Sequence, residues 1–154
     1  MSDTPNILVP LASEADTAAL GARLALAARA GDCILLQGPI GAGKSCLARA
    51  FIRALCGPTE EVPSPTFTLV QVYEAQGVEI WHADLYRLTH PDEVWELGLD
   101  EAFQSAICLV EWPDRLGKHR PEMALCLTLE SLGDGRLARI SGGSDHLRKA
   151  LQDV

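Results

Sequence analysis

The chain has 154 residues, of which 47% are hydrophobic, and a net charge of −8 with a pI near 4.9. This length suits one domain with a sizeable core and excludes a nucleotide domain joined to a separate substrate domain. The acidic charge argues against autonomous nucleic-acid binding, because contacts to a phosphate backbone need a basic surface. The sequence has no run of 18 apolar residues and no basic-then-apolar leader, so we expect a cytoplasmic protein without a membrane span.

A short strand and a helix are the first elements that the pattern predicts. Ile7–Val9 is an apolar run typical of a strand. The segment Ser13–Asp16 has the form of a capping box, and apolar residues at helical spacing follow it as far as Ala27. We expect Gly31 to close this helix.

Residues 38–45 read G-P-I-G-A-G-K-S and match the G-x-x-x-x-G-K-[ST] phosphate-binding loop. The apolar strand Cys33–Leu36 precedes this P-loop, and a helical pattern that ends at Gly57 follows it. Here backbone N–H groups cradle phosphate oxygens, Lys44 reaches the β- and γ-phosphates, and the Ser45 hydroxyl ligates Mg²⁺. A glycine-rich turn that binds nothing would leave both side chains unexplained. We therefore predict that ATP or another nucleoside triphosphate binds with Mg²⁺ at Gly38, Gly41, Ala42, Gly43, Lys44, Ser45 and Cys46.

The middle of the chain combines an irregular loop with a hairpin and a short helix. Residues 57–65 are rich in proline and glycine, which makes the segment a candidate switch or lid. Residues 68–74 and 78–84 are strand-like runs separated by a turn, so we expect them to pair as an antiparallel hairpin. Residues 91–97 predict a short helix that ends before a glycine.

The last third of the chain predicts a buried strand, a second hairpin and a final helix. Residues 106–110 are wholly apolar, as expected of a parallel strand that is covered on both faces. Residues 124–130 and 136–141 form the predicted hairpin, and residues 145–151 the helix. This order indicates an α/β fold in which residues 1–154 form a single P-loop NTPase domain. Its central sheet is expected to be mainly parallel, with antiparallel hairpins at its edges and flanking helices.

Two carboxylates are candidates for the second half of an ATPase site. A P-loop protein needs an acidic residue at a neighbouring strand end to hold Mg²⁺, and often a carboxylate that orients the attacking water. Glu111 follows the apolar strand, and Asp84 ends the first hairpin. For either residue alone, a solvated carboxylate at a strand end is the competing interpretation, and which of them contacts the metal stays open. His82 is interpreted as a hydrogen-bonded strand residue, since no cysteine or second histidine lies at metal-ligand spacing.

The five cysteines form no C-x-x-C pair and lie mostly in apolar runs. This pattern favours buried free thiols over a disulfide framework. Whether Cys46, beside the P-loop, is sensitive to oxidation stays open.

Four motifs, in their order and spacing, resemble the TsaE family of bacterial tRNA threonylcarbamoyladenosine biosynthesis ATPases. The motifs are Gly38–Ser45, Ser64–Val70, His82–Leu88 and Val110–Pro113. The resemblance implies a small ATPase that is slow alone and assists a threonylcarbamoyl transferase (TsaD-like) with its companion subunit (TsaB-like). That complex modifies adenosine 37 of tRNAs that read codons beginning with A, and this chain would meet tRNA only through it.

The same resemblance implies roles for individual residues. Ser45 and Glu111 would ligate Mg²⁺, Asp84 would be needed for hydrolysis, and the Thr66 hydroxyl would approach the γ-phosphate or the metal. The other implied nucleotide contacts are Trp112, Glu14 near the purine, and Arg136. From the residues alone, a tryptophan in this position can equally pack in the core, the proline-rich segment before the hairpin can be a simple turn, and a strand arginine can be solvated.

Two other functions stay open. A small-molecule or nucleotide kinase would share the P-loop but would need an acceptor pocket and an arginine-bearing lid. Apart from the loop of residues 59–65, the sequence has no insertion long enough to supply them. A non-catalytic assembly switch would use ATP only to fix a loop for docking. Phosphate release without an acceptor, and its dependence on Asp84, distinguish the three.

Overall fold

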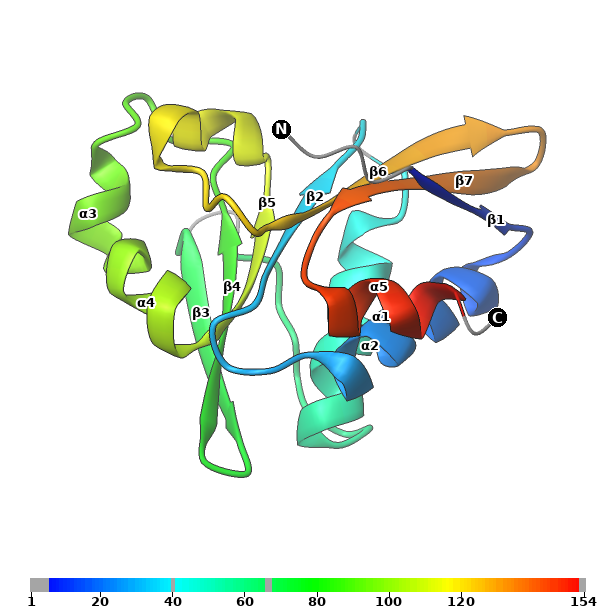
Figure 1. The fold of residues 1–154 in the computed structure, drawn as a ribbon, viewed down its shortest axis with the longest axis horizontal. Helices are drawn as coiled ribbons and strands as arrows, with labels where there is room; N and C mark the ends of the chain where they lie inside the picture. Colours follow the sequence, from blue (N-terminus) through cyan, green and yellow to red (C-terminus); the bar gives the residue numbers. More distant parts are fainter. Residues whose placement is uncertain (1–5, 40, 66–67, 153–154) are drawn as a thin grey trace.

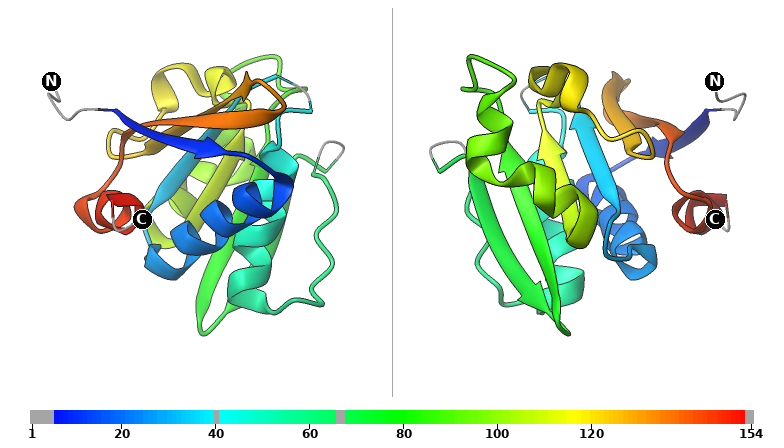
Figure 2. Two further views of the ribbon diagram at one scale, coloured as in Figure 1. Left: turned by 90° about the vertical axis from the view of Figure 1, so that its right-hand side faces the viewer. Right: turned by 60° about the vertical axis from the view of Figure 1, so that its left-hand side comes forward.

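A single seven-stranded sheet forms the centre of the computed structural model, which describes residues 6–39, 41–65 and 68–152. The strand order across the sheet is β1-β7-β6-β2-β5-β4-β3. Helices lie on both of its faces (Figures 1 and 2). The strands are β1 (Ile7–Leu11), β2 (Cys33–Gln37), β3 (Val70–Ala75), β4 (Val78–Asp84), β5 (Ile107–Glu111), β6 (Leu125–Leu132) and β7 (Gly135–Gly142). The helices are α1 (Glu14–Ala27), α2 (Lys44–Cys56), α3 (Glu93–Leu97), α4 (Leu99–Ser105), α5 (Asp145–Gln152) and the 3₁₀ helix η1 (Pro113–His119).

The centre of the sheet is parallel and its edges are antiparallel, as predicted. Strands β6, β2, β5 and β4 are paired parallel to one another. Strand β3 folds back on β4 at one edge, whereas β7 folds back on β6 towards the other. Beyond β7, β1 pairs antiparallel and forms the outer edge, so the second hairpin contributes an interior strand. The strands at the two ends of the sheet run in clearly different directions in Figure 1, as the twist of a sheet requires.

The sheet packs against its helices through two apolar cores, one on each face. Leu24 of α1, Phe51 of α2 and Leu147 of α5 belong to the core on one face. Val94 of α3 and Leu99 of α4 belong to the core on the other. Strand β5 is buried along its whole length because both cores cover it, which explains its unbroken apolar sequence. No helix within the described residues is long and apolar enough to cross a membrane.

Helix boundaries follow the capping signals of the sequence, but two short helices were not predicted. The Ser13 hydroxyl caps α1 by accepting the Asp16 N–H at 3.3 Å, and α1 ends at Ala27, before the expected stop at Gly31. Helix α4 follows α3 directly, because Gly98 (φ 83°) ends one helix and begins the next. Helix η1 follows β5 after a single residue. Both helices are too short for a 3.6-residue periodicity to be recognised.

Candidate functional site

The P-loop connects β2 to α2 and uses glycine where the backbone requires it. Gly43 precedes α2 with φ 107°, in the left-handed region that other residues rarely adopt. A Cβ atom on Gly38 would lie 2.7 Å from the carbonyl oxygen of Leu129, so a larger residue does not fit. Because α2 begins at Lys44, the unpaired N–H groups of its first turn lie at the end of this loop. This is the local geometry of a phosphate site.

Lys44 lies between the P-loop backbone and an aromatic ring. Its Nζ donates a 2.6 Å hydrogen bond to the carbonyl of Gly38 and lies 3.7 Å from the ring centroid of Trp112. Burial lowers the pKa of Lys44, and attraction by the carboxylates of Glu111 and Asp84 opposes that shift. The ammonium is thus held within the site by one short hydrogen bond and one aromatic contact.

The two candidate carboxylates lie side by side. Asp84 and Glu111 are register partners at the carboxyl ends of the parallel strands β4 and β5, and Glu111 is also paired with Leu36 of β2. Their exposed fractions are only 6% and 4%. The Asp84 carboxylate accepts the backbone N–H of Tyr86 at 3.0 Å. Sheet register thus brings together two acidic residues that lie far apart in the sequence.

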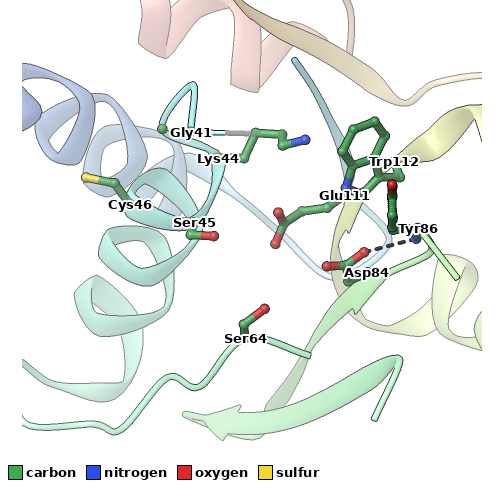
Figure 3. A pocket seen from close by; sticks show the side chains of 10 residues that line it. Gly41, Lys44, Ser45, Cys46, Ser64, Asp84, Tyr86, Glu111 and Trp112 are labelled. Carbon is green, nitrogen blue, oxygen red and sulfur yellow. Dashed lines mark hydrogen bonds between the residues drawn. The ribbon is translucent and has the colours of Figure 1, made fainter. Parts of the chain in front are cut away.

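One cavity of about 430 Å³ joins these groups. In Figure 3 the Ser45 hydroxyl and the carboxylates of Asp84 and Glu111 point into the same space, with Lys44 above them and Ser64 below. Ser64 belongs to the loop between α2 and β3 and was not predicted as a site residue. Thr66, which was predicted as one, lies outside the described residues. The described residues that line the cavity are Gly41, Gly43, Lys44, Ser45, Cys46, Ser64, Asp84, Tyr86, Glu111 and Trp112.

The donor set of the cavity suits a hard cation. No group of three or more histidine, cysteine, aspartate or glutamate residues in the described part of the chain is placed to hold a metal ion. Mg²⁺, however, binds oxygen ligands and commonly keeps several waters and substrate phosphates in its shell. The hydroxyl of Ser45 and the carboxylates of Glu111 and Asp84 surround one space and fit an ion completed in that way.

Trp112 lines the cavity and does not lie fully in the core. Its backbone is left-handed (φ 58°), and its ring lies 4.8 Å from that of Tyr86, between centroids. Because it directly follows Glu111, the turn after β5 places an aromatic face beside the second carboxylate. The ring is thus available to a ligand as well as to Lys44.

A second hollow, of about 250 Å³, lies on the other side of the P-loop between α1 and the turn before β7. Glu14 and Arg136, both predicted to contact the nucleotide, line it. Cys46 lines both hollows, and its thiol donates to the Glu14 carbonyl at 3.7 Å. Burial raises the pKa of this thiol, which disfavours the reactive thiolate.

Arg136 contacts the P-loop itself. Its guanidinium donates to the carbonyls of Gly41 at 3.0 Å, Ala42 at 3.2 Å and Gly135 at 3.1 Å. These hydrogen bonds hold the carbonyls of Gly41 and Ala42 on the side of the P-loop that faces β7. The fork of donors in arginine fits this arrangement better than the single ammonium of lysine.

We expect Arg136→Lys to raise the Kd for ATP about tenfold, a loss of about 1.4 kcal/mol in preorganisation of the loop. Isothermal titration calorimetry measures the change. Arg139→Lys is the matched control, since Arg139 lies on the same strand but is exposed and pairs with Glu130. Equal affinity of the Arg136 variant and the control would rule out a contribution of the guanidinium fork.

Comparison with known proteins identifies the family. The sequence model of the family described as "Threonylcarbamoyl adenosine biosynthesis protein TsaE" matches residues 11–138. The chain belongs to the TsaE family. The matched TsaE range contains the P-loop and every candidate site residue, whereas α5 lies beyond it.

Individual TsaE relatives are similar over most of the chain. A protein of Rickettsia conorii named tRNA threonylcarbamoyladenosine biosynthesis protein TsaE is 37% identical over 82% of this chain and 72% of its own length. Proteins of the same name from Treponema pallidum and Bacillus subtilis are 34% and 37% identical over 80% and 77% of this chain, and over 90% and 74% of their own lengths. The crystal structure of YdiB from Bacillus subtilis superposes with a TM-score of 0.80 at 25% identity, covering 99% of this chain and 96% of that chain.

Proposed function

We propose that this TsaE-family protein binds ATP with Mg²⁺ and hydrolyses it slowly, in support of N6-threonylcarbamoyladenosine formation at position 37 of tRNAs that read codons beginning with A. The tRNA pathway is the one named for its relatives. The ATPase activity is inferred from the site.

One observation carries the ATPase proposal: the P-loop and two register-paired carboxylates line a single cavity. Lys44 supplies the positive charge for the β- and γ-phosphates, and the first turn of α2 supplies N–H donors. Asp84 and Glu111 lie across the cavity from Ser45 (Figure 3). A phosphate-binding end that faces a carboxylate end is the arrangement that nucleotide hydrolysis requires.

Each acidic residue has a proposed task. Glu111, with Ser45, would hold Mg²⁺, which neutralises charge on the phosphate oxygens when it is bound. Asp84 would orient the attacking water or a group that holds it. Its carboxylate is fixed by the Tyr86 N–H and is therefore preorganised for such a role.

The hollow beside α1 is the proposed place of the nucleoside. It adjoins the P-loop on the side of Glu14 and contains polar groups from α1 and the β6–β7 turn. Trp112 would contact the nucleotide from the opposite side, where it lines the larger cavity.

The partners would be a TsaD-like threonylcarbamoyl transferase and its TsaB-like companion subunit. The net charge of −8 favours contact with tRNA through that complex over direct binding. Because the pathway acts on tRNA, the cytoplasm is the proposed place of action.

The deciding experiment is a phosphate-release assay on the purified protein, alone and with both partners, with Lys44→Ala as the blank. We expect slow release alone, without any acceptor, and strong stimulation by the partners. Phosphate transfer to an added small molecule would favour a kinase instead. Tight nucleotide binding with no release under any condition would leave only an assembly switch.

A further inference from the structure

His82 is a buried histidine that contacts a site residue, and the proposed function leaves it without a role. It lies on β4 two residues before Asp84, so both side chains point to the same face of the sheet. In the neighbouring strand β5, Leu109 is the register partner of His82 and Glu111 that of Asp84. His82 and Glu111 are therefore diagonal neighbours on that face.

The two side chains are directly hydrogen-bonded. His82 Nε2 lies 2.8 Å from Glu111 Oε2, and the exposed fractions of the two residues are 2% and 4%. A carboxylate has only acceptor oxygens, so the imidazole N–H at Nε2 is the donor. His82 Nδ1 is buried and has no hydrogen-bond partner among the described residues, so the bond to Glu111 is the one described polar contact of the ring.

This hydrogen bond restricts the Glu111 carboxylate. A glutamate has three side-chain torsions, and the last of them rotates easily unless a partner holds it. Oε2 is held by the imidazole, while Glu111 lines the cavity into which its carboxylate points in Figure 3. The arrangement resembles the outer-shell hydrogen bonds that orient metal-ligating carboxylates in other proteins.

We propose that His82 is a positioning residue that holds Oε2 of Glu111 and so presents the other carboxylate oxygen to Mg²⁺. The inference rests on the proposed function, in which Glu111 serves the metal site. His82 itself touches neither metal nor nucleotide. Loss of the His82 hydrogen bond is expected to raise the Mg²⁺ concentration needed for nucleotide binding about 10- to 100-fold, the usual effect of losing such a partner.

The test is the Mg²⁺ dependence of binding of a fluorescent, non-hydrolysable ATP analogue, which needs no turnover. In His82→Gln the side-chain amide nitrogen lies about as far from the backbone as Nε2 of histidine, so the hydrogen-bond donor to Glu111 is kept. In His82→Asn the side chain is one methylene shorter, so its amide does not reach Glu111. We expect wild-type protein and His82→Gln to saturate at similar Mg²⁺ concentrations, and His82→Asn to need about 10- to 100-fold more. Affinity without Mg²⁺ should be the same for all three.

Two further measurements separate positioning from a general structural effect. Thermal unfolding of both variants reports their fold, and only the Mg²⁺ requirement should distinguish Gln from Asn at matched stability. In a Glu111→Gln background, His82→Asn should add no further loss, because the two residues act as one unit.

The outcomes also separate this inference from the proposed function. If wild-type binding depends on Mg²⁺ but His82→Gln and His82→Asn show equal midpoints, the positioning role is wrong and the ATPase proposal stands. The positioning role is also wrong if His82→Asn raises the Mg²⁺ requirement further in the Glu111→Gln background. If wild-type binding does not respond to Mg²⁺, both proposals fail.

Discussion

Replacing Asp84 with asparagine is expected to lower ATP turnover about 10²- to 10⁴-fold, the range associated with loss of a positioned acid–base group. The Kd for ATP should change little. Asparagine keeps the volume of the side chain, and its amide oxygen can still accept the Tyr86 N–H that holds the carboxylate at 3.0 Å. What disappears is the negative charge that we propose orients the attacking water. Single-turnover phosphate release, together with calorimetric ATP titration, measures the two quantities separately.

Asp114→Asn is the matched control for that experiment. Asp114 is exposed, lies near the P-loop and acts electrostatically on Lys44, but it does not line the cavity that Asp84 shares with Ser45. Removing its charge should leave turnover nearly unchanged. Turnover retained by Asp84→Asn would contradict the catalytic assignment and favour an assembly switch.

Glu111→Gln completes the comparison and decides which carboxylate serves the metal. If a substitution raises the Mg²⁺ concentration needed for nucleotide binding, the residue it replaces is the metal ligand. If a substitution lowers only turnover, the residue it replaces orients the water. The two carboxylates are register partners at neighbouring strand ends, so this pair of substitutions compares two charges in nearly the same place.

The parts of the site that depend on local sequence were predictable. A P-loop requires left-handed or crowded backbone at fixed positions, so the glycines at 38 and 43 reveal its conformation directly. The strand before it and the helix after it are visible as apolar patterns. Asp84 and Glu111 were recognisable because each ends a strand-like run, and the parallel pairing of β4 with β5 then places both at one edge of the sheet.

Contacts that depend on register and packing between distant segments were not predictable. His82 and Glu111 are 29 residues apart, and Arg136 reaches carbonyls about 94 residues away. No periodicity encodes such distances. The prediction that His82 is a hydrogen-bonded strand residue is confirmed, but nothing in the sequence pattern indicates Glu111 as its partner. A nucleotide contact of Arg136 stays a prediction, and the hydrogen bonds of its guanidinium to the P-loop backbone were not predicted.

The cavity joins opposite charges. Lys44 is its single basic side chain among the described lining residues, whereas Asp84 and Glu111 contribute two carboxylates. Without Lys44 no basic side chain among the described lining residues would offset the two carboxylates. This imbalance makes Lys44 the position at which loss of charge should affect binding most.

Lys44→Met is expected to weaken ATP binding about 10- to 150-fold, the equivalent of one hydrogen bond to a charged group at about 1.5–3 kcal/mol. Methionine retains most of the aliphatic stem, so packing beneath the P-loop is preserved while the ammonium is lost. Calorimetric titration of ATP measures the change. The affected quantity differs from that in Asp84→Asn, because Lys44→Met is expected to change the Kd for ATP and Asp84→Asn the turnover.

Lys118→Met provides the control, because Lys118 is exposed on η1 and does not line the cavity. An equal loss of affinity in both variants would mean that overall charge, and not the placement of Lys44, governs binding.

A second readout tests the observed geometry. The Lys44 ammonium lies 3.7 Å from the Trp112 ring centroid, so its removal should change the fluorescence of Trp112 in the nucleotide-free protein. A Trp112→Phe background removes that signal and shows which tryptophan reports it. Unchanged emission in Lys44→Met would contradict the contact between Lys44 and Trp112, while the affinity measurement would still decide the role of the charge.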